Sequence, residues 1–288
     1  MSELLLEIFS EEIPARMQGR AADDLKRLII EGLKARGLEV GAAMAFATPR
    51  RLTLAVQNVP AMSPALCDER KGPRVGAPEK AVEGFLKAAG LTSLDAAEII
   101  KDDKKGDYYL ARIEKPGRAA ADIIAETVPD VMGRFPWPKS MRWGSSSFQW
   151  VRPIHSILCL LAGKVVAFEV AGLASGDTTR GHRFHGREPI KPNSFEDYGK
   201  KLMRAKVLLP TSEREAAIVE QARDLAKTAK LTWVEDLGLA AENAGLTEWP
   251  TVYMGSFDKA FLDVPAEVLM TSMKQHQKCF SLKDPKSG

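Results

Sequence analysis

Cysteine is scarce in this sequence, with three residues among 288, and they stand far apart at Cys67, Cys159 and Cys279. An odd number of widely spaced cysteines does not make a disulfide framework or a paired-cysteine zinc site. The pattern fits a reducing compartment, so we expect a cytoplasmic protein. The N-terminus carries acidic residues where a secretory signal would carry basic ones, and no export signal is expected.

Long apolar runs are also missing. No stretch approaches the ~20 consecutive apolar residues that span a membrane, and the apolar run at residues 154–162 is short. We therefore expect no membrane association. A hydrophobic content of 45% with 27% charged residues is typical of a globular protein. A length of 288 residues favours two domains, or one domain with an insert.

Motifs for several catalytic chemistries are absent. The sequence has no Gly-rich phosphate loop, no Gly-x-Ser-x-Gly elbow and no His-Asp dipeptide. His182 and His185 stand three apart with His155 upstream, but zinc needs three or four ligands of matched geometry and no cysteine lies nearby. We predict no catalytic residue, no metal site and no cofactor site in this chain.

A basic segment with interleaved aromatic residues is present at residues 134–191. It contains nine Lys or Arg and three acidic residues, an excess of six positive charges in a chain whose net charge is +3. Three of the five Trp and three of the four His also lie in it. Cations that neutralise phosphate, beside rings that stack on bases, are what a nucleic-acid surface needs. A solvated basic face beside buried tryptophans is the alternative interpretation.

Hydrophobic periodicity and turn residues predict an α+β fold, with mixed sheets and packed helices. The expected core comprises residues 1–72 and 134–288, and residues 73–133 form a small α/β insert. Helices are predicted at about 14–36, 79–89, 119–132, 212–229, 235–243 and 265–275. Strands are predicted at 4–9, 44–47, 52–56, 107–113, 154–161, 164–171, 251–254 and 277–282. The pair 154–161 and 164–171 is expected to form a hairpin that turns at Ala162-Gly163.

Two local patterns near the C-terminal end carry further expectations. Ser212 with Glu215 three residues later predicts a capping box that opens a helix. The strand at 277–282 is followed by a turn at 284–288 and by no return strand. A hairpin cut at its tip predicts that this chain is part of a longer protein.

Several blocks together resemble one family, the β subunit of bacterial glycyl-tRNA synthetase. They are LLEIFSEEIPAR at 5–16, TPRRL at 48–52, KSMRWG at 139–144, VRPI at 151–154, TRGHRF at 179–184, EWP at 248–250, GSFD at 255–258, FL at 261–262 and MKQHQKCF at 273–280. Each block alone is weak, but their collinear order is specific. His155 stands where the family tends to have an aromatic residue, and Cys279 where it tends to have tyrosine.

The resemblance implies a heterotetrameric ligase of two α and two β subunits that joins glycine to its tRNA. In that family the α subunit activates glycine, using ATP and Mg²⁺, and the β subunit mainly recognises and positions the tRNA. The expected partners of this chain are therefore the α subunit and tRNA(Gly). Family members continue into a His-Asp-type domain and an anticodon-binding domain, and neither is encoded here.

The candidate tRNA-binding residues are cations with two ring-bearing side chains among them. They are Arg50, Arg51, Lys139, Arg142, Trp143, Arg152, Arg180, His182 and Arg183. Arg142 and Arg152 could instead pair with buried acids, and Trp143 could be a core residue.

Two other functions stay open. The early region is also similar to a domain of the phenylalanyl enzyme that hydrolyses mischarged tRNA, so an editing-like module is one alternative, although no hydrolytic motif stands in this sequence. The other is a scaffold that docks the α subunit.

Overall fold

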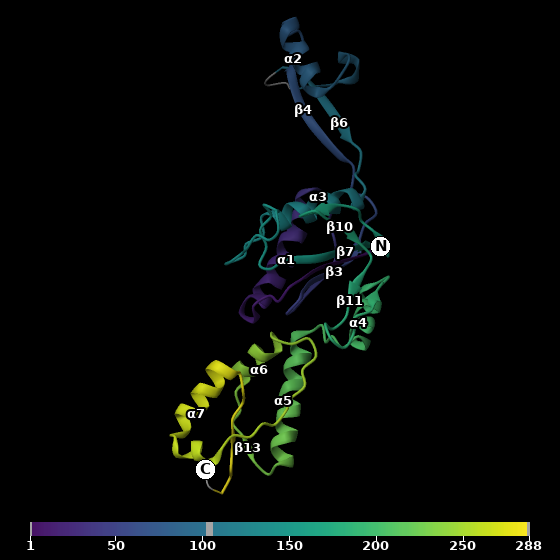
Figure 1. Cartoon of the computed structure of the whole chain (residues 1–288). Helices are drawn as coiled ribbons and strands as arrows, with labels where there is room; N and C mark the ends of the chain where they lie inside the picture. Colours follow the sequence, from purple (N-terminus) through teal and green to yellow (C-terminus); the bar gives the residue numbers. More distant parts are fainter. Residues whose placement is uncertain (1, 102–105, 287–288) are drawn as a thin grey trace.

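The computed structural model describes residues 2–101 and 106–286 and confirms the α+β class (Figure 1). Its α-helices are α1 (Ala15–Ala35), α2 (Glu79–Ala89), α3 (Ala120–Gly133), α4 (Phe195–Arg204), α5 (Thr211–Thr228), α6 (Leu237–Ala244) and α7 (Ala266–Ser272). The strands of the main sheet are β1 (Ser2–Ser10), β2 (Ala43–Thr48), β3 (Arg51–Val59), β7 (Ile154–Leu161), β8 (Lys164–Val165), β9 (Glu169–Val170) and β10 (Leu173–Gly176). The remaining strands are β4 (Leu66–Arg74), β5 (Glu98–Ile100), β6 (Tyr108–Lys115), β11 (Thr179–Arg180), β12 (Pro189–Ile190), β13 (Thr232–Trp233) and β14 (Leu282–Lys283).

The main sheet has the strand order β2-β3-β1-β7-β10-β9, with β8 paired to β7. The N-terminal strand β1 is central, antiparallel to β3 on one side and to β7 on the other. The turn at Ala162-Gly163 joins β7 to β8, as predicted, and both residues have the positive φ that such a turn requires. Residues 164–171 do not form one strand, because β8 ends at Val165 and β9 pairs with β10 instead.

Alternation along β1 gives the sheet two different faces. Leu4, Leu6 and Ile8 pack into the larger core, which α1 and α3 cover. Leu5 packs into a second core, on the side that contains Tyr198 and Leu202 of α4. Successive strand residues point to opposite faces, so Glu7 lies on the same face as Leu5, beneath α4. A charged residue in the middle of an apolar strand therefore faces a protein interior.

A small separate sheet, β4-β6-β5, projects from the main body together with α2 (Figure 1). Its core centres on Phe85, Ala89 and Ala111. Gly72 lies directly under the Phe85 ring, where an added Cβ would come within 2.8 Å of the ring. The predicted insert, residues 73–133, overlaps this unit, but its predicted start falls inside β4 and its predicted end includes α3, which packs on the larger core.

The C-terminal part contains α5, α6, β13, α7 and β14 around a small core of Ile218, Ala240 and Ala244. Helix α5 begins one residue before the predicted capping residue, after Pro210, and no side chain caps it. Ser212 therefore lies inside the helix, and the predicted capping box is wrong. The residue before the helix is instead Pro210, whose backbone is extended, with φ −69° and ψ 131°.

Both strands predicted near the C-terminal end need correction. Residues 251–254 have no regular structure. The predicted strand at 277–282 is reduced to β14, which begins at Leu282 and pairs with β13, so the strand does have a partner. Residues 273–277 instead form a π-helical turn after α7. Ser287 and Gly288 of the predicted terminal turn lie outside the described residues.

Candidate nucleic-acid interface

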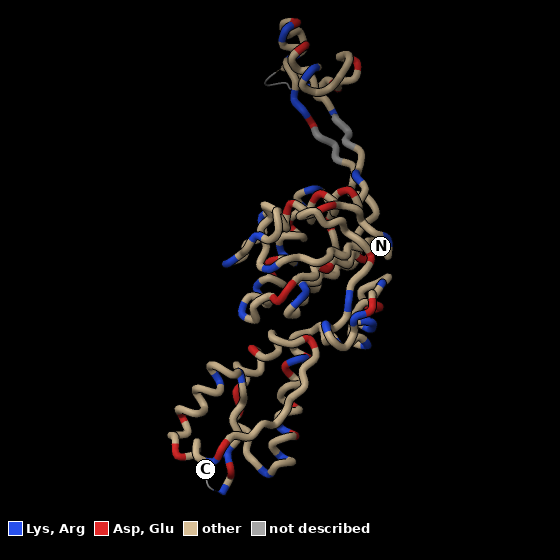
Figure 2. Tube along the Cα trace, in the orientation of Figure 1, with Lys and Arg blue, Asp and Glu red and all other residues tan. Residues whose placement is uncertain are grey.

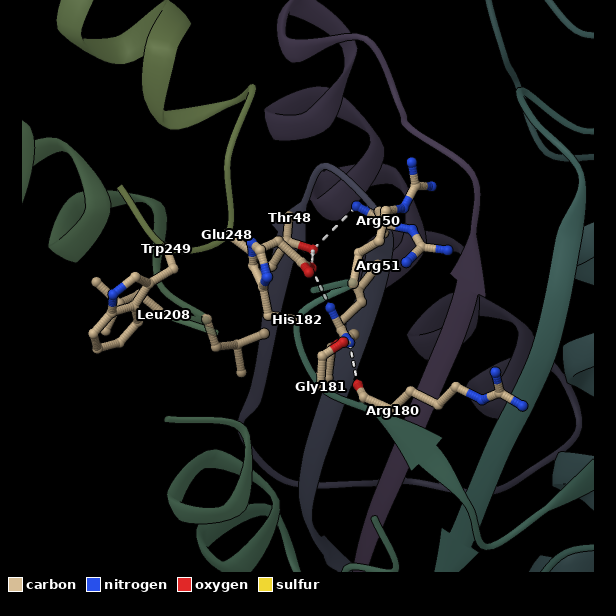
Figure 3. A network of polar contacts seen from close by, with 12 residues as sticks. Thr48, Arg50, Arg51, Arg180, Gly181, His182, Leu208, Glu248 and Trp249 are labelled. Carbon is tan, nitrogen blue, oxygen red and sulfur yellow. Dashed lines mark hydrogen bonds and ion pairs between the residues drawn. The ribbon is translucent and has the colours of Figure 1, made fainter. Parts of the chain in front are cut away.

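Arg51 is fully buried and lies at the centre of a polar network (Figure 3). Its Nε donates to Glu7 Oε2 at 3.2 Å, its Nη1 bonds to Glu248 Oε1, and its Nη2 bonds to the carbonyl oxygen of Arg180. A guanidinium group saturated in this way is not presented to an RNA phosphate. The prediction that Arg51 contacts phosphate is therefore corrected, because the two buried carboxylates already occupy it.

The carboxylates beside Arg51 are held in different ways. Burial raises the pKa of Glu7, and Arg51 only partly opposes this effect. Burial also tends to raise the pKa of Glu248, but the charge of Arg51 together with the hydrogen bonds from Thr48 and Arg51 outweighs it, and the pKa of Glu248 is lowered. Thr48 Oγ1 donates to Glu248 Oε1 at 2.6 Å, and the Tyr198 hydroxyl donates to Glu7. Each carboxylate thus has a second donor besides Arg51.

The buried network fixes the backbone of a basic loop, residues 179–187. Arg51 bonds to the carbonyls of Arg180 and Gly181 at the start of this loop. His182 N then donates at 2.9 Å to the carbonyl oxygen of Ala205, the residue that directly follows α4. A Cβ on Gly181 would lie 2.4 Å from Ala205 Cβ, so the close approach requires glycine there. The loop is therefore held by the fold before any ligand arrives.

An exposed ion cluster lies next to this loop and is centred on Glu11. Glu11 accepts from Arg183 Nη2 at 2.6 Å and from His155 Nε2 at 2.8 Å, and Arg50 Nη2 lies 3.9 Å away. Arg183 also reaches Glu12 at 2.9 Å. Burial tends to raise the pKa of Glu11, but the hydrogen bonds from His155 and Arg183 outweigh it and lower the pKa to about 2.

Arg50 is the half-buried member of the exposed cluster. Its guanidinium carbon lies 4.6 Å from the centre of the Phe9 ring. Burial lowers the pKa of Arg50, and the neighbouring charge of Arg183 adds to this effect. The positive charges of Arg50 and Arg183 repel one another, so a further anion bound between them would lower their electrostatic energy.

The other predicted site residues fall into two groups. Arg180 and His182 share the basic loop; Arg180 is exposed, and the half-buried His182 ring stacks on His185 with centroids 4.7 Å apart. Burial lowers the pKa of His182. Lys139 and Arg142 lie exposed on a separate segment, residues 134–150.

Trp143 and Arg152 are both half-buried. Trp143 packs against the larger core and edge-on against Phe148. Arg152 donates to the carbonyl of Val151 at 2.7 Å.

Of the predicted site residues, the structure brings Arg50, Arg180, His182 and Arg183 into one region.

Comparison with known proteins decides what this region belongs to. A family model described as glycyl-tRNA synthetase beta subunit matches residues 4–288. The chain belongs to this family.

Relatives in the glycyl-tRNA synthetase β-subunit family align over the whole chain. The glycine–tRNA ligase beta subunits of Ruegeria sp. (strain TM1040) and Paracoccus denitrificans (strain Pd 1222) are 56% and 53% identical to it. That of Dinoroseobacter shibae is 52% identical. The chain spans 42% of the length of each of the first two relatives and 40% of the third.

The family motifs contain functional neighbours that charge counting missed. Glu7, Glu11 and Glu248 each lie within a motif and each bonds to an arginine of another motif. An acid inside an otherwise apolar strand, as at Glu7, is the one sequence signal that pointed to a buried pair. Nothing near Glu248 signals its burial, because its partner is 197 residues away.

Further cations beside α4 were also missed. Lys191, Lys201 and Arg204 line a shallow cavity of about 370 Å³ together with His185. Figure 2 shows Lys and Arg gathered near α4 and β11. Lys191 pairs with Asp177 at 3.1 Å and Lys201 with Asp197 at 2.8 Å, whereas Arg204 has no ion pair among the described residues. The basic surface therefore extends beyond the predicted residues.

The described part of the chain contains neither a metal-binding cluster nor a membrane-spanning helix. Within residues 2–101 and 106–286, no group of three or more His, Cys, Asp or Glu side chains is arranged to hold a metal ion. In the same ranges, no helix is long and apolar enough to cross a membrane. Cys159 is buried, and burial raises the pKa of its thiol, whereas Cys279 is exposed.

Proposed function

We propose that this chain recognises and positions tRNA for glycylation by the active site of a separate α subunit. The observation that carries the proposal is the basic loop, which carries Arg183, is held rigid by the buried Arg51 network and lies beside Arg50. Rigid, closely spaced cations bind a phosphate backbone without losing side-chain and loop freedom on association.

Unpaired charge supports the same proposal. Arg142, Arg180 and Arg187 are exposed and form no ion pair among the described residues. In a protein with a net charge of only +3, such cations are available for phosphate contacts. The relatives are named glycine–tRNA ligase beta subunits, which supports tRNA(Gly) as the RNA.

The remaining parts of the proposal concern the holoenzyme. The α subunit is the proposed partner, in a heterotetramer of two α and two β subunits, and it would use ATP and Mg²⁺. The chain itself would bind no cofactor and supply no catalytic residue. We propose a cytoplasmic location, where translation takes place.

A binding experiment tests the proposal directly. The chain is mixed with tRNA(Gly) and purified α subunit, and complexes are detected by sedimentation at several salt concentrations. We expect the affinity for tRNA to fall steeply as salt rises, because counterions are released on binding. Binding to the α subunit without any affinity for tRNA would favour the scaffold alternative. Release of an amino acid from a mischarged tRNA would favour the editing alternative.

A further inference from the structure

A second feature lies between the first turns of α1 and the segment at residues 135–139. It is a cavity of about 370 Å³, whose apolar wall is formed by Met17 and Ala21 on the helix side and by Phe135, Trp137 and the two flanking prolines on the other. We call it the aromatic groove. Its volume lies at the lower end of the range for small-molecule sites.

The wall of the aromatic groove is rigid. Pro136 and Pro138 restrict the backbone on both sides of Trp137, and Trp137 N donates to Phe135 O at 2.8 Å across this tight turn. The Trp137 ring packs against Phe135 at 4.9 Å and edge-on against the fully buried Trp150 at 5.1 Å. Trp137 is itself half-buried, and its buried Nε1 has no hydrogen-bond partner among the described residues. A preformed aromatic wall is therefore in place.

The rim of the aromatic groove is positively charged. Arg16, Arg20 and Lys139 line it and all three are exposed. Asp24 is the one acid in the lining; it lies 3.5 Å from Arg20 and is shared with Arg27, which is closer at 2.8 Å. Three cations thus surround the opening, and a single acid, already paired, opposes them.

We propose that the aromatic groove binds an unstacked nucleotide of RNA, with its base against Trp137 and its phosphate on Arg16, Arg20 and Lys139. This inference rests on the proposed function, since it assumes that the chain binds tRNA. Stacking of a base on a protein ring and neutralisation of the adjacent phosphate are the two components of single-strand binding. A base inside a double helix cannot enter, because both its faces are already covered, so the site selects a loop or an end.

The chain offers a matched pair of variants for the test. Arg20 and Arg27 both pair with Asp24 from the same helix, but only Arg20 lines the groove. The probe is a short fluorescent single-stranded RNA, compared with a duplex of equal length, and binding is read by anisotropy. Arg20→Gln should weaken single-strand binding severalfold and reduce its salt slope by about one, whereas Arg27→Gln should leave both unchanged.

A second variant tests the stacking wall. Trp137→Leu should weaken single-strand binding by about tenfold or more, because base stacking on an aromatic ring contributes substantially to affinity. Trp137→Phe keeps an aromatic ring at this position and should therefore retain most of the single-strand binding that Trp137→Leu loses. Thermal unfolding of each variant separates a loss of folding from a loss of stacking, and the Arg20→Gln result does not depend on either variant.

The outcomes distinguish the two proposals. If tRNA(Gly) binds with a steep salt dependence, but Arg20→Gln binds single-stranded RNA as well as Arg27→Gln does and Trp137→Leu binds it as well as Trp137→Phe does, the groove inference is overturned and the proposed function stands. If the unaltered chain binds neither tRNA nor single-stranded RNA, both fail. If single-stranded RNA binds elsewhere and Arg20→Gln instead weakens binding of the α subunit, the groove is a protein-binding site and the inference is wrong.

Discussion

The arginines of this chain differ in what their guanidinium groups touch, and the difference decides what each can do. Arg51 has no exposure and bonds to two carboxylates and two carbonyls. Arg214 is also buried, and it donates to the carbonyls of Ala47, Leu208, Leu209 and Ala244. Burial lowers the pKa of Arg214 to about 10. Arg51 and Arg214 thus hold separate segments of the chain together inside the protein, whereas Arg142 is exposed.

Removal of Arg51 should destabilise the fold. Arg51→Ala leaves Glu7 and Glu248 buried without their common cation, and breaking such a pair costs roughly 3–5 kcal/mol of unfolding free energy. Urea denaturation measures this loss. Arg112→Ala is the control, because its ion pairs with Glu69 and Glu98 are exposed and its loss should change stability by less than about 1 kcal/mol. A stable Arg51→Ala protein with a reduced salt slope for tRNA would return Arg51 to the binding surface.

Arg142 should behave in the opposite way. It is exposed and has no ion pair among the described residues, so Arg142→Ala should leave the melting temperature nearly unchanged. It should reduce the salt slope for tRNA binding by about one for a lost phosphate contact. Arg183→Ala should give the same change in slope, with a small loss of stability from the pairs with Glu11 and Glu12.

Arg223 provides the charge-matched control for these two variants. It pairs with Glu235 on the C-terminal part, and Arg223→Ala removes one positive charge away from the basic loop. If all three variants lower the slope equally, net charge rather than local contact governs binding.

The stability contributed by Glu11 should depend on pH in a defined direction. Its pKa in the folded protein, about 2, lies below the ordinary value of 4.5. The contribution is therefore complete above pH 4.5 and is lost as the pH falls toward 2. The difference in unfolding free energy between wild type and Glu11→Gln should shrink over that window. A carboxyl titration of Glu11 by NMR checks the pKa itself, and an ordinary value would mean that the exposed cluster does not persist in solution.

At the scale of secondary structure, elements with a strong local pattern were predicted well. Three examples are the periodicity of α1, the Gly90 stop of α2 and the apolar run of β1. Each of these signals is encoded by residues that are close together in the sequence. Short strands such as β14 have two residues, and their existence depends on a partner some fifty positions away, β13. No local pattern can supply that information.

The candidate site was predictable to a similar extent. The excess of cations marked the segment 134–191, which contains the basic loop, and one family motif contains both Arg50 and Arg51. Which of these two neighbours is buried depends on strand parity: β3 begins at Arg51, opposite Phe9, so Arg51 lies on the face that carries Glu7. Sequence alone did not reveal that a distant acid, Glu248, would complete the pair.

The pairing of β13 with β14 should protect amide hydrogens only weakly. The ladder joins Thr232 to Lys283 and Trp233 to Leu282, with one further bond from Val234 N to Ser281 O at 3.0 Å. So short a ladder opens without disturbing the main sheet. Hydrogen exchange should therefore be much faster at Val234 than at Leu6 in the central strand. Equal protection at these two sites would show that the C-terminal part unfolds only together with the core.

At the scale of the whole molecule, the proposed division of labour between this chain and an α subunit gives a clear biochemical expectation. The chain alone should not form glycyl-adenylate, since it has no nucleotide-phosphate loop. Glycine-dependent exchange of pyrophosphate into ATP is the assay, with a preparation free of α subunit. Activity should arise when purified α subunit is added, and exchange by the chain alone would overturn the assignment of catalysis to the partner.

The long separation between Arg51 and Glu248 also has a consequence for synthesis on the ribosome. The two residues are 197 positions apart, so at 5–20 residues per second Arg51 waits roughly 10–40 s for this partner. In the earlier part of this interval, before α4 (residues 195–204) is made, the growing polypeptide holds the pair of Arg51 and Glu7 on a sheet face that α4 does not yet cover. While this sheet face is uncovered, Arg51 and Glu7 can form non-native ion pairs with other parts of the chain. A chaperone that shields nascent chains would therefore be most useful to this protein in that interval.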